Sequence, residues 1–236
     1  VAFDLARANH AAYHTAPVEA ATFLPPFVEA IAAREGTLGP GRFRLISLRD
    51  SRYIVPPSLY GLLGHDAQAV EGRQALALAH NTSFHIETVY YYLPAIKAVL
   101  PPNLGIDAAA RFNVSYYIGH RVYFQSPRFT QAFVAELPDY DLALFQNPVP
   151  AKPRAYLSRR PERAASPVDL TTLLARADFL SSEVDVIETS EQALPGPAQG
   201  GLAVIERYDP EDVRVRVETP QPAVLVLLDA FDQGWT

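Results

Sequence analysis

The last segment of the chain, RVETPQPAVLVLLDAFDQGWT, constrains the fold most. The alternation begins three residues before this segment and continues into it. Valines and charged residues alternate over 213–218, which predicts a strand with one apolar face and one solvent-exposed face (Val213, Arg214, Val215, Arg216, Val217, Glu218). After the turn at Pro220–Pro222, the apolar run 223–228 predicts a central strand that is buried on both faces. Because a buried strand at a free terminus would leave an edge uncovered, we expect a portion of a longer protein. The start at Val1 favours the same interpretation.

The composition is that of a globular protein without a nucleic-acid function. The 236 residues are 49% hydrophobic and 19% charged, enough for one large domain or two small joined ones. A net charge of -6 and scattered basic residues argue against binding to nucleic acid. The absence of cysteine excludes disulfides, thiolate nucleophiles and cysteine-ligated zinc. We find no apolar run of ~18 residues that would span a bilayer, and no leader at Val1.

Periodicity and punctuation predict helices and strands in both halves of the chain. The expected helices are 3–13, a helix opened by Pro25-Pro26 and ended by Gly36, 94–100, 127–135, and one capped by Ser166-Pro167. The expected strands are 42–48, 113–118 with a continuation or partner at 122–124, 142–145, 154–157, 184–187, 202–205, 213–217 and 224–228. Residues 67–79 fit either a helix or a strand, whereas 53–66 and 194–201 are typical of loops.

These elements predict an α+β fold. Helices and strands mix up to Gln146-Asn147-Pro148, and antiparallel-looking strands dominate afterwards. We therefore expect a mixed helix–strand lobe over residues 1–147. It would pack against an antiparallel, β-sandwich-like lobe over 148–236, truncated at its C-terminus.

The histidines suggest two chemical sites, each with a simpler explanation. His10 and His14 would share one helix face and could bind a metal, but a metal site needs three or more convergent ligands. His80, His85 and Glu87 could include a general base, yet HNTSFH is equally typical of a loop that caps its own backbone. We assign no catalytic residue, no metal ligand and no cofactor.

Tyrosines and asparagines offer weaker signals. On a strand, Tyr90 and Tyr92 would share a face and could stack on sugar rings, although core packing explains such tyrosines as well. Asn81 and Asn113 begin triplets that match the short N-glycosylation pattern.

Several segments in order resemble a known family. They are FRLISL, HNTSFHIETVYYYLPAIKAVL, ARFNVSYYI, LALFQNPVPAKPRAYLS and LVLLDAFDQGW. Together they resemble the extracytoplasmic region of bacterial YfhO-type polytopic membrane proteins, which are related to GT-C glycosyltransferases. The matching positions are Arg44, Asn81, Tyr91, 113–118, Asn147, 153–156 and 225–235. The chain departs from the pattern at 231–233, where the family has an aromatic–proline pair before Gly-Trp.

The resemblance implies a parent protein with many transmembrane helices that uses a polyprenyl-phosphate-linked sugar. In such proteins the catalytic acids lie among those helices, so this chain would be a non-catalytic accessory domain on the outer, extracytoplasmic side of the bacterial membrane. Its partners would be the transmembrane part of its own chain and a glycan or polyprenyl-linked sugar. The candidate contacts are Asn81, Tyr91, Arg154, Tyr156 and Trp235.

Structural roles remain open for the same residues. Arg154 could pair with a carboxylate between the lobes, and Trp235 could fill the core. Two other hypotheses for the chain are a freestanding carbohydrate-binding or interaction module, and a soluble hydrolase that uses His80, His85 and Glu87.

Overall fold

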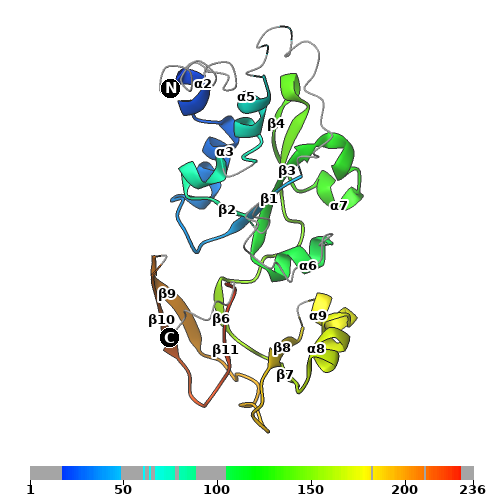
Figure 1. Ribbon diagram of the computed structural model, residues 1–236, viewed down its shortest axis with the longest axis vertical. Helices are drawn as coiled ribbons and strands as arrows, with labels where there is room; N and C mark the ends of the chain where they lie inside the picture. The colour runs from blue at the N-terminus through cyan, green and yellow to red at the C-terminus, as the bar shows by residue number, and fades with distance from the viewer. Residues whose placement is uncertain are drawn as a thin grey trace, which may run out of the picture.

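The chain combines a mixed sheet with several small sheets, and both helices and strands are abundant, which confirms the predicted α+β class (Figure 1). The computed structural model describes residues 18–48, 61, 64, 67–77, 80–88, 105–181, 183–209 and 211–229. In Figure 1 the mixed sheet and its helices occupy the upper part of the molecule, and the small sheets lie below.

The first half of the chain forms a five-stranded sheet. Its strands are β1 (Arg44–Ser47), β2 (Glu87–Thr88), β3 (Val114–His120), β4 (Phe133–Leu137) and β5 (Leu142–Gln146). The order is β2-β1-β3-β5-β4, in which β1 runs parallel to both neighbours and β5 antiparallel to both. All residues of β3 except Ser115 are buried, so the central strand of the fold lies here.

Helices cover both faces of this sheet. They are α3 (Pro26–Glu35), α5 (Ala67–Gln74), η2 (His80–Phe84), α6 (Ile106–Arg111), η3 (Arg121–Phe124) and α7 (Pro127–Thr130). Helix α2 (Val18–Thr22) packs on α5, and η4 (Pro138–Tyr140) joins β4 to β5. One apolar cluster joins Phe27 and Ile31 of α3 to Tyr116 and Leu144 of the sheet. A second cluster, built largely of aromatic rings, lies around Tyr117 on the other face.

Helix α3 forms where the proline and glycine signals predict it. Pro26 occupies the first turn, where its missing N–H costs nothing, and Gly36 ends the helix with a φ of 77°. The Gly36 N–H donates to the Ala32 carbonyl, which closes the last turn. Phe27, Val28 and Ile31 form its buried face.

The second half of the chain consists of three two-stranded sheets and two short helices. Its elements are β6 (Ala155–Leu157), β7 (Pro161–Ala164), α8 (Pro167–Leu174), α9 (Ala177–Leu180), β8 (Asp185–Glu188), β9 (Leu202–Asp209), β10 (Asp212–Glu218) and β11 (Leu225–Leu227). The pairs β9–β10 and β6–β11 are antiparallel, whereas β7 and β8 pair in parallel. The predicted cap of α8 is confirmed, because the Ser166 side chain accepts from the Asp169 N–H.

Two predicted elements between β3 and β5 are wrong. Residues 122–124 do not continue the strand; they form η3, a 3-10 turn that buries Phe124 against Tyr117 and Phe129. The helix predicted over 127–135 ends at Thr130, and Phe133 begins β4. Pairing with β5 supplies backbone hydrogen bonds for this segment, and that tertiary contact outweighs local helix preference.

The C-terminal strand differs from its prediction. Leu225–Leu227 pairs with β6 in a two-stranded sheet, and Leu225 remains 41% exposed, so β11 is neither central nor buried on both faces. The alternation over 213–217 does produce a strand, but Val217 is 39% exposed. The ambiguous segment 67–79 contains the helix α5.

Some predictions lie outside the described residues, namely the helices over 3–13 and 94–100 and most of the loop over 53–66. In the described part of the chain, no helix has the length and apolar character needed to cross a bilayer.

Candidate functional site

Two polar clusters join the halves of the chain, and the first surrounds Asp229. Arg154 directs its Nη2 at Asp229 Oδ1 (2.5 Å), at the Tyr208 hydroxyl (2.5 Å) and at Glu87 (3.2 Å). The Tyr208 hydroxyl also contacts both Asp229 oxygens at 2.8 Å. Arg44 donates to the Leu228 carbonyl at 2.6 Å and lies 3.4 Å from Asp229. Residues from β1, β2 and β9 and the residue before β6 thus meet around one carboxylate; we call this the Asp229 cluster.

Burial shapes the ionisation of the Asp229 cluster. Desolvation and the neighbouring Arg154 charge lower the pKa of Arg44 to about 10, against its usual 12.5. Desolvation raises the pKa of Tyr208 to about 12, so the phenol is neutral at physiological pH. Two arginines share the carboxylates of Glu87 and Asp229, and the cluster has formal charges of equal number and opposite sign.

The second cluster surrounds Asp185. Its Oδ1 accepts hydrogen bonds from Arg111 (2.9 Å), the Tyr156 hydroxyl (2.6 Å) and Lys152 Nζ (3.2 Å), and its Oδ2 accepts from Ser158 at 2.6 Å. Arg111 comes from the end of α6, whereas Tyr156 and Ser158 belong to β6 and the residue after it. We call this the Asp185 cluster.

Aromatic rings hold the cations of the Asp185 cluster. The Arg111 guanidinium lies 3.8 Å from the centre of the Phe179 ring, and its Nη1 donates to the Phe179 carbonyl. Lys152 Nζ lies 4.4 Å from the Tyr156 ring centre. The basic side chains therefore have fixed positions next to the carboxylate.

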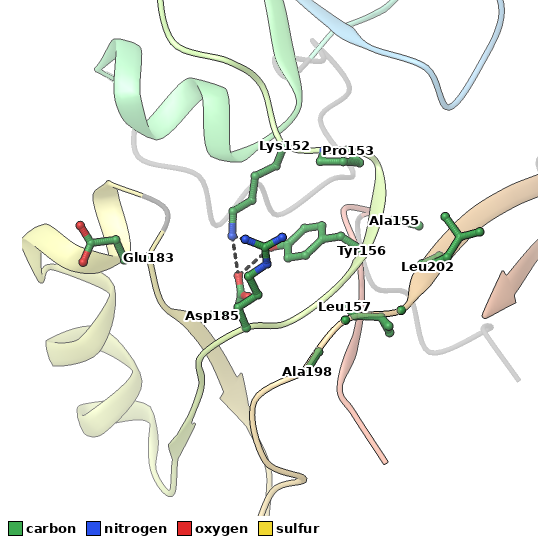
Figure 2. A pocket seen from close by; sticks show the side chains of 13 residues that line it. Lys152, Pro153, Ala155, Tyr156, Leu157, Glu183, Asp185, Ala198 and Leu202 are labelled. Carbon is green, nitrogen blue, oxygen red and sulfur yellow. Dashed lines mark hydrogen bonds and ion pairs between the residues drawn. The ribbon is translucent and has the colours of Figure 1, made fainter. Parts of the chain in front are cut away.

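A pocket of about 570 Å³ opens beside the Asp185 cluster (Figure 2). Figure 2 shows the Lys152 ammonium and the Asp185 carboxylate facing each other next to the Tyr156 ring. Apolar residues supply much of the remaining wall, and the full lining comprises Lys152, Pro153, Ala155, Tyr156, Leu157, Arg159, Glu183, Asp185, Ala198, Gly200, Gly201, Leu202 and Ala203. An apolar wall with a few convergent polar groups is the usual form of a small-molecule site.

The turn that closes the pocket requires glycine. Gly201 has a φ of 108°, and a Cβ there would lie 2.5 Å from the Glu218 carbonyl oxygen and 2.8 Å from Leu157. Gly200 has a φ of 102°, but a Cβ there would meet nothing within 4 Å. The backbone is therefore closely packed against its neighbours at Gly201, whereas it has no such neighbour at Gly200.

The ionisation states suit binding better than proton transfer. Burial alone would raise the pKa of Asp185. Hydrogen bonds from Ser158 and Tyr156 and the charges of Lys152 and Arg111 outweigh that effect, so this pKa lies below its usual 3.8. Burial and the Asp185 hydrogen bond raise the pKa of Tyr156. A fully hydrogen-bonded carboxylate with a lowered pKa is a poor general base.

The residues that sequence analysis proposed as contacts are distributed over different places. Tyr156 lines the pocket. Arg154 belongs to the Asp229 cluster, which is the structural alternative considered for it. Asn81 is buried and donates from Nδ2 to the Ile86 carbonyl at 2.6 Å, so it ties together its own loop. Tyr91 and Trp235 lie outside the described residues.

The other candidates have structural positions. Glu87 pairs with Arg154 and accepts from the Gly41 N–H, and His85 is exposed. Asn113 is buried and donates to the carbonyls of Arg42 and Lys152. Burial of Asn81 and Asn113 is incompatible with glycosylation in the folded protein. His10 and His14 are not described, and the described residues contain no group of three or more potential metal ligands.

Sequence reasoning missed the importance of Asp185, Lys152 and Ser158. A signal for two of them was present, because the polar residues of KPRAYLS recur at every second position (Lys152, Arg154, Tyr156, Ser158). That period places them on one side of an extended segment. An aspartate between valines at the start of the strand VDVI is a comparable signal for a buried charge.

Comparisons with protein-family models, curated proteins and solved structures found no match for this chain.

Proposed function

We propose that this chain is a non-catalytic accessory domain of a membrane-embedded, GT-C-like glycosyltransferase, located on the extracytoplasmic side of a bacterial membrane. Its role is to hold the glycan of a lipid-linked sugar or of an acceptor beside the transmembrane part of the same protein. The observation that carries the binding role is the pocket of about 570 Å³ beside Tyr156, Lys152 and Asp185.

The chemistry of the pocket supports a glycan ligand. Sugars present hydroxyl groups that need both donors and acceptors, and apolar C–H faces that pack on aromatic or aliphatic surface. Lys152 supplies donors and the exposed carboxylate of Glu183 supplies an acceptor, while the Tyr156 ring and Leu202 supply apolar surface. The volume lies within the range of roughly 300–1,000 Å³ that is usual for ligand sites.

The membrane parent is supported by the ordered resemblance to YfhO-type proteins, and the non-catalytic role by the state of the site. Asp185 is held by four donors, and Glu87 is held by Arg154 and Gly41. The pKa of Asp185 is lowered, whereas a general acid needs a raised one. The pairing of Glu87 with Arg154 also disfavours the hydrolase hypothesis.

Binding is tested by blocking the pocket from its rim. Leu202 lines the pocket and is 43% exposed, so Leu202→Trp should fill space without disturbing the core. Leu225→Trp is the matched control, because Leu225 is 41% exposed on β11 and is not part of the lining. We expect binding of a glycan panel, followed by calorimetry or NMR titration, to weaken at least about tenfold in Leu202→Trp alone. No glycan binding by the wild type, or equal binding by both variants, contradicts the proposed role.

The location is tested by labelling. The chain contains no cysteine, so a cysteine introduced at exposed Arg216 is unique within it. In intact cells that express the full-length protein, a membrane-impermeant maleimide should label Arg216→Cys without lysis. Labelling only after lysis would place the domain in the cytoplasm, and the absence of apolar segments of ~20 residues from the full reading frame would remove the membrane parent.

A further inference from the structure

Positive charge exceeds negative charge around Asp185. Arg111 and Lys152 both lie within 3.2 Å of this one carboxylate. Arg159 lines the same pocket. Burial lowers the pKa of the Lys152 ammonium, and the charges of Arg111 and Arg159 lower it further. Two cations thus contact one buried anion, and a third cation, Arg159, lines the same pocket near Lys152, in a chain whose net charge is -6.

The single carboxylate of Asp185 cannot neutralise all of these positive charges. Its Oδ1 already accepts from Arg111 and Tyr156 at 2.9 and 2.6 Å, and Lys152 makes the longest contact, at 3.2 Å. Of the two cations paired with Asp185, Lys152 is the more exposed: 21% of its side-chain surface is exposed, against 6% for Arg111. An ammonium has three N–H donors, and the contacts to Asp185 and to the Tyr156 hydroxyl involve two. Lys152 can therefore donate a hydrogen bond to a ligand while it keeps its contact with Asp185.

The acidic residue on the rim does not cancel this excess. Glu183 lines the pocket, but it is exposed, and Figure 2 shows its carboxylate pointing away from the Lys152–Asp185 pair. Water screens an exposed carboxylate more strongly than the half-buried Lys152. Gly200 also lines the pocket, and a Cβ placed there would meet no atom within 4 Å.

We infer that the pocket selects glycans that carry an anionic group, a phosphate or a carboxylate, which Lys152 and Arg159 bind. This rests on the proposed glycan-binding function and adds the charge of the ligand to it. Because phosphate and carboxylate share the chemistry of oxygen anions that accept charged hydrogen bonds, the experiment separates the two.

The test compares sugars of one shape and different charge. The probes are methyl glucoside, methyl glucuronide, glucose 1-phosphate and inorganic phosphate, each titrated by calorimetry. We expect the wild type to bind at least one anionic sugar about tenfold more tightly than methyl glucoside, because a charge-assisted hydrogen bond is stronger than a neutral one. The advantage should shrink at high salt. Which of the two anionic sugars binds more tightly identifies the anionic group.

Two variants locate the effect. Lys152→Gln should abolish the preference, because a neutral amide cannot make a charge-assisted hydrogen bond, and it should weaken the binding of methyl glucoside less than the binding of the anionic sugars. Because Lys152 is partly buried, the exposed Arg159→Gln provides a second variant that does not disturb folding, and it should reduce the preference several-fold. Arg214→Gln, an exposed change on β10 and outside the lining, is the control and should alter nothing.

The outcomes separate the inference from the proposed function. Equal affinity for charged and neutral sugars, or a preference that survives in both variants, overturns the anion selectivity and leaves glycan binding intact. Binding of inorganic phosphate without any sugar supports the anion site and overturns the glycan function. Absence of binding by all four probes overturns both.

Discussion

In the five-stranded sheet, Tyr116, Ile118 and Leu144 are completely buried against α3 and one another, so contacts between large apolar side chains dominate. In the second half of the chain, the most deeply buried residues are small or polar, such as Ala164, Ser158 and Asp185. Its long hairpin, β9–β10, is half-exposed along most of its length. An apolar core can fold by its own burial energy, whereas a region with little apolar burial needs neighbours.

The two polar clusters supply those neighbours. Arg111 reaches from α6 to Asp185, and Arg44 reaches from β1 to Asp229, so each cluster ties the second half to the sheet. Charged contacts of this kind depend strongly on geometry, because desolvation opposes them. The first half should therefore respond most to lost volume, and the second half to lost charge.

Removal of core volume is expected to have the largest effect. Leu144→Ala on β5 should lower the free energy of unfolding by about 3.5 kcal/mol, since it removes a completely buried side chain and leaves a cavity. The same change at Leu225, which is 41% exposed on β11, should cost about 0.5 kcal/mol. Urea unfolding followed by circular dichroism measures both. Similar losses at the two leucines would show that the halves do not differ in apolar packing.

Removal of charge between the halves is expected to rank next. Arg154→Met should cost about 3 kcal/mol, because it leaves Glu87 and Asp229 without their shared partner in a partly buried site. Arg121→Ala is the control, since its pair with Glu136 is exposed, and it should cost less than about 1 kcal/mol. The Nε and Nη1 of Arg154 are buried without a hydrogen-bond partner among the described residues, so the arginine itself is imperfectly satisfied. Equal effects at Arg154 and Arg121 would mean that the Asp229 cluster contributes no more than a surface pair.

The contrast also explains what the sequence could predict. Regular patterns identified helices whose start and stop signals are local, such as α3 with Pro26 and Gly36 and α8 with its Ser166 cap. The apolar run of β5 was also correctly predicted as a strand. Segment 127–135 failed, because pairing of β4 with β5 decides its structure, and the periodicity within 127–135 contains no signal of that partner. Residues 223–228 failed for the related reason that an apolar run does not reveal which neighbours will cover it.

The candidate site was predictable only in part. The resemblance pointed to Tyr156 and Arg154, and alternation along KPRAYLS could have added Lys152 and Ser158. Asp185, however, lies 29 residues beyond Tyr156, and only the fold brings the two together. The order of segments along a chain cannot supply such a contact, so the pocket follows from tertiary structure.

A backbone change at Gly41 tests the contact between the halves on a smaller scale. Its φ is 74°, and a Cβ there would lie 2.9 Å from the Tyr208 ring on β9. Gly41→Ala should cost about 2 kcal/mol, from strain in the left-handed region and displacement of Tyr208 from Asp229. Gly36→Ala has a similar φ, 77°, and meets nothing within 4 Å, so strain alone should cost about 1 kcal/mol. If both variants lose the same stability, the fit between Gly41 and Tyr208 is not part of the interface energy.

The smallest expected effect is a change in the acid dependence of stability. A carboxyl group whose pKa is lower in the folded protein than in the unfolded chain stabilises the fold above its unfolded value, which is 3.8 for aspartate. That contribution is lost as the pH falls below 3.8 and through the folded-state pKa. Asp185→Asn should therefore unfold with a flatter dependence on pH below 3.8 than the wild type, whatever its stability at neutral pH. Urea unfolding across the acid range measures this slope.

Salt makes this comparison sharper, because exposed Asp107 also has a lowered pKa, caused first by its hydrogen bond from Arg128. Asp107 and Arg128 are about half exposed, whereas the side chain of Asp185 is 4% exposed. Ions in solution screen the exposed pair and reach the buried one poorly. In high salt the difference between Asp107→Asn and the wild type should fade, while the difference at Asp185 persists. If salt removes both differences equally, water reaches Asp185 as freely as Asp107, and the second half is not held by buried charge.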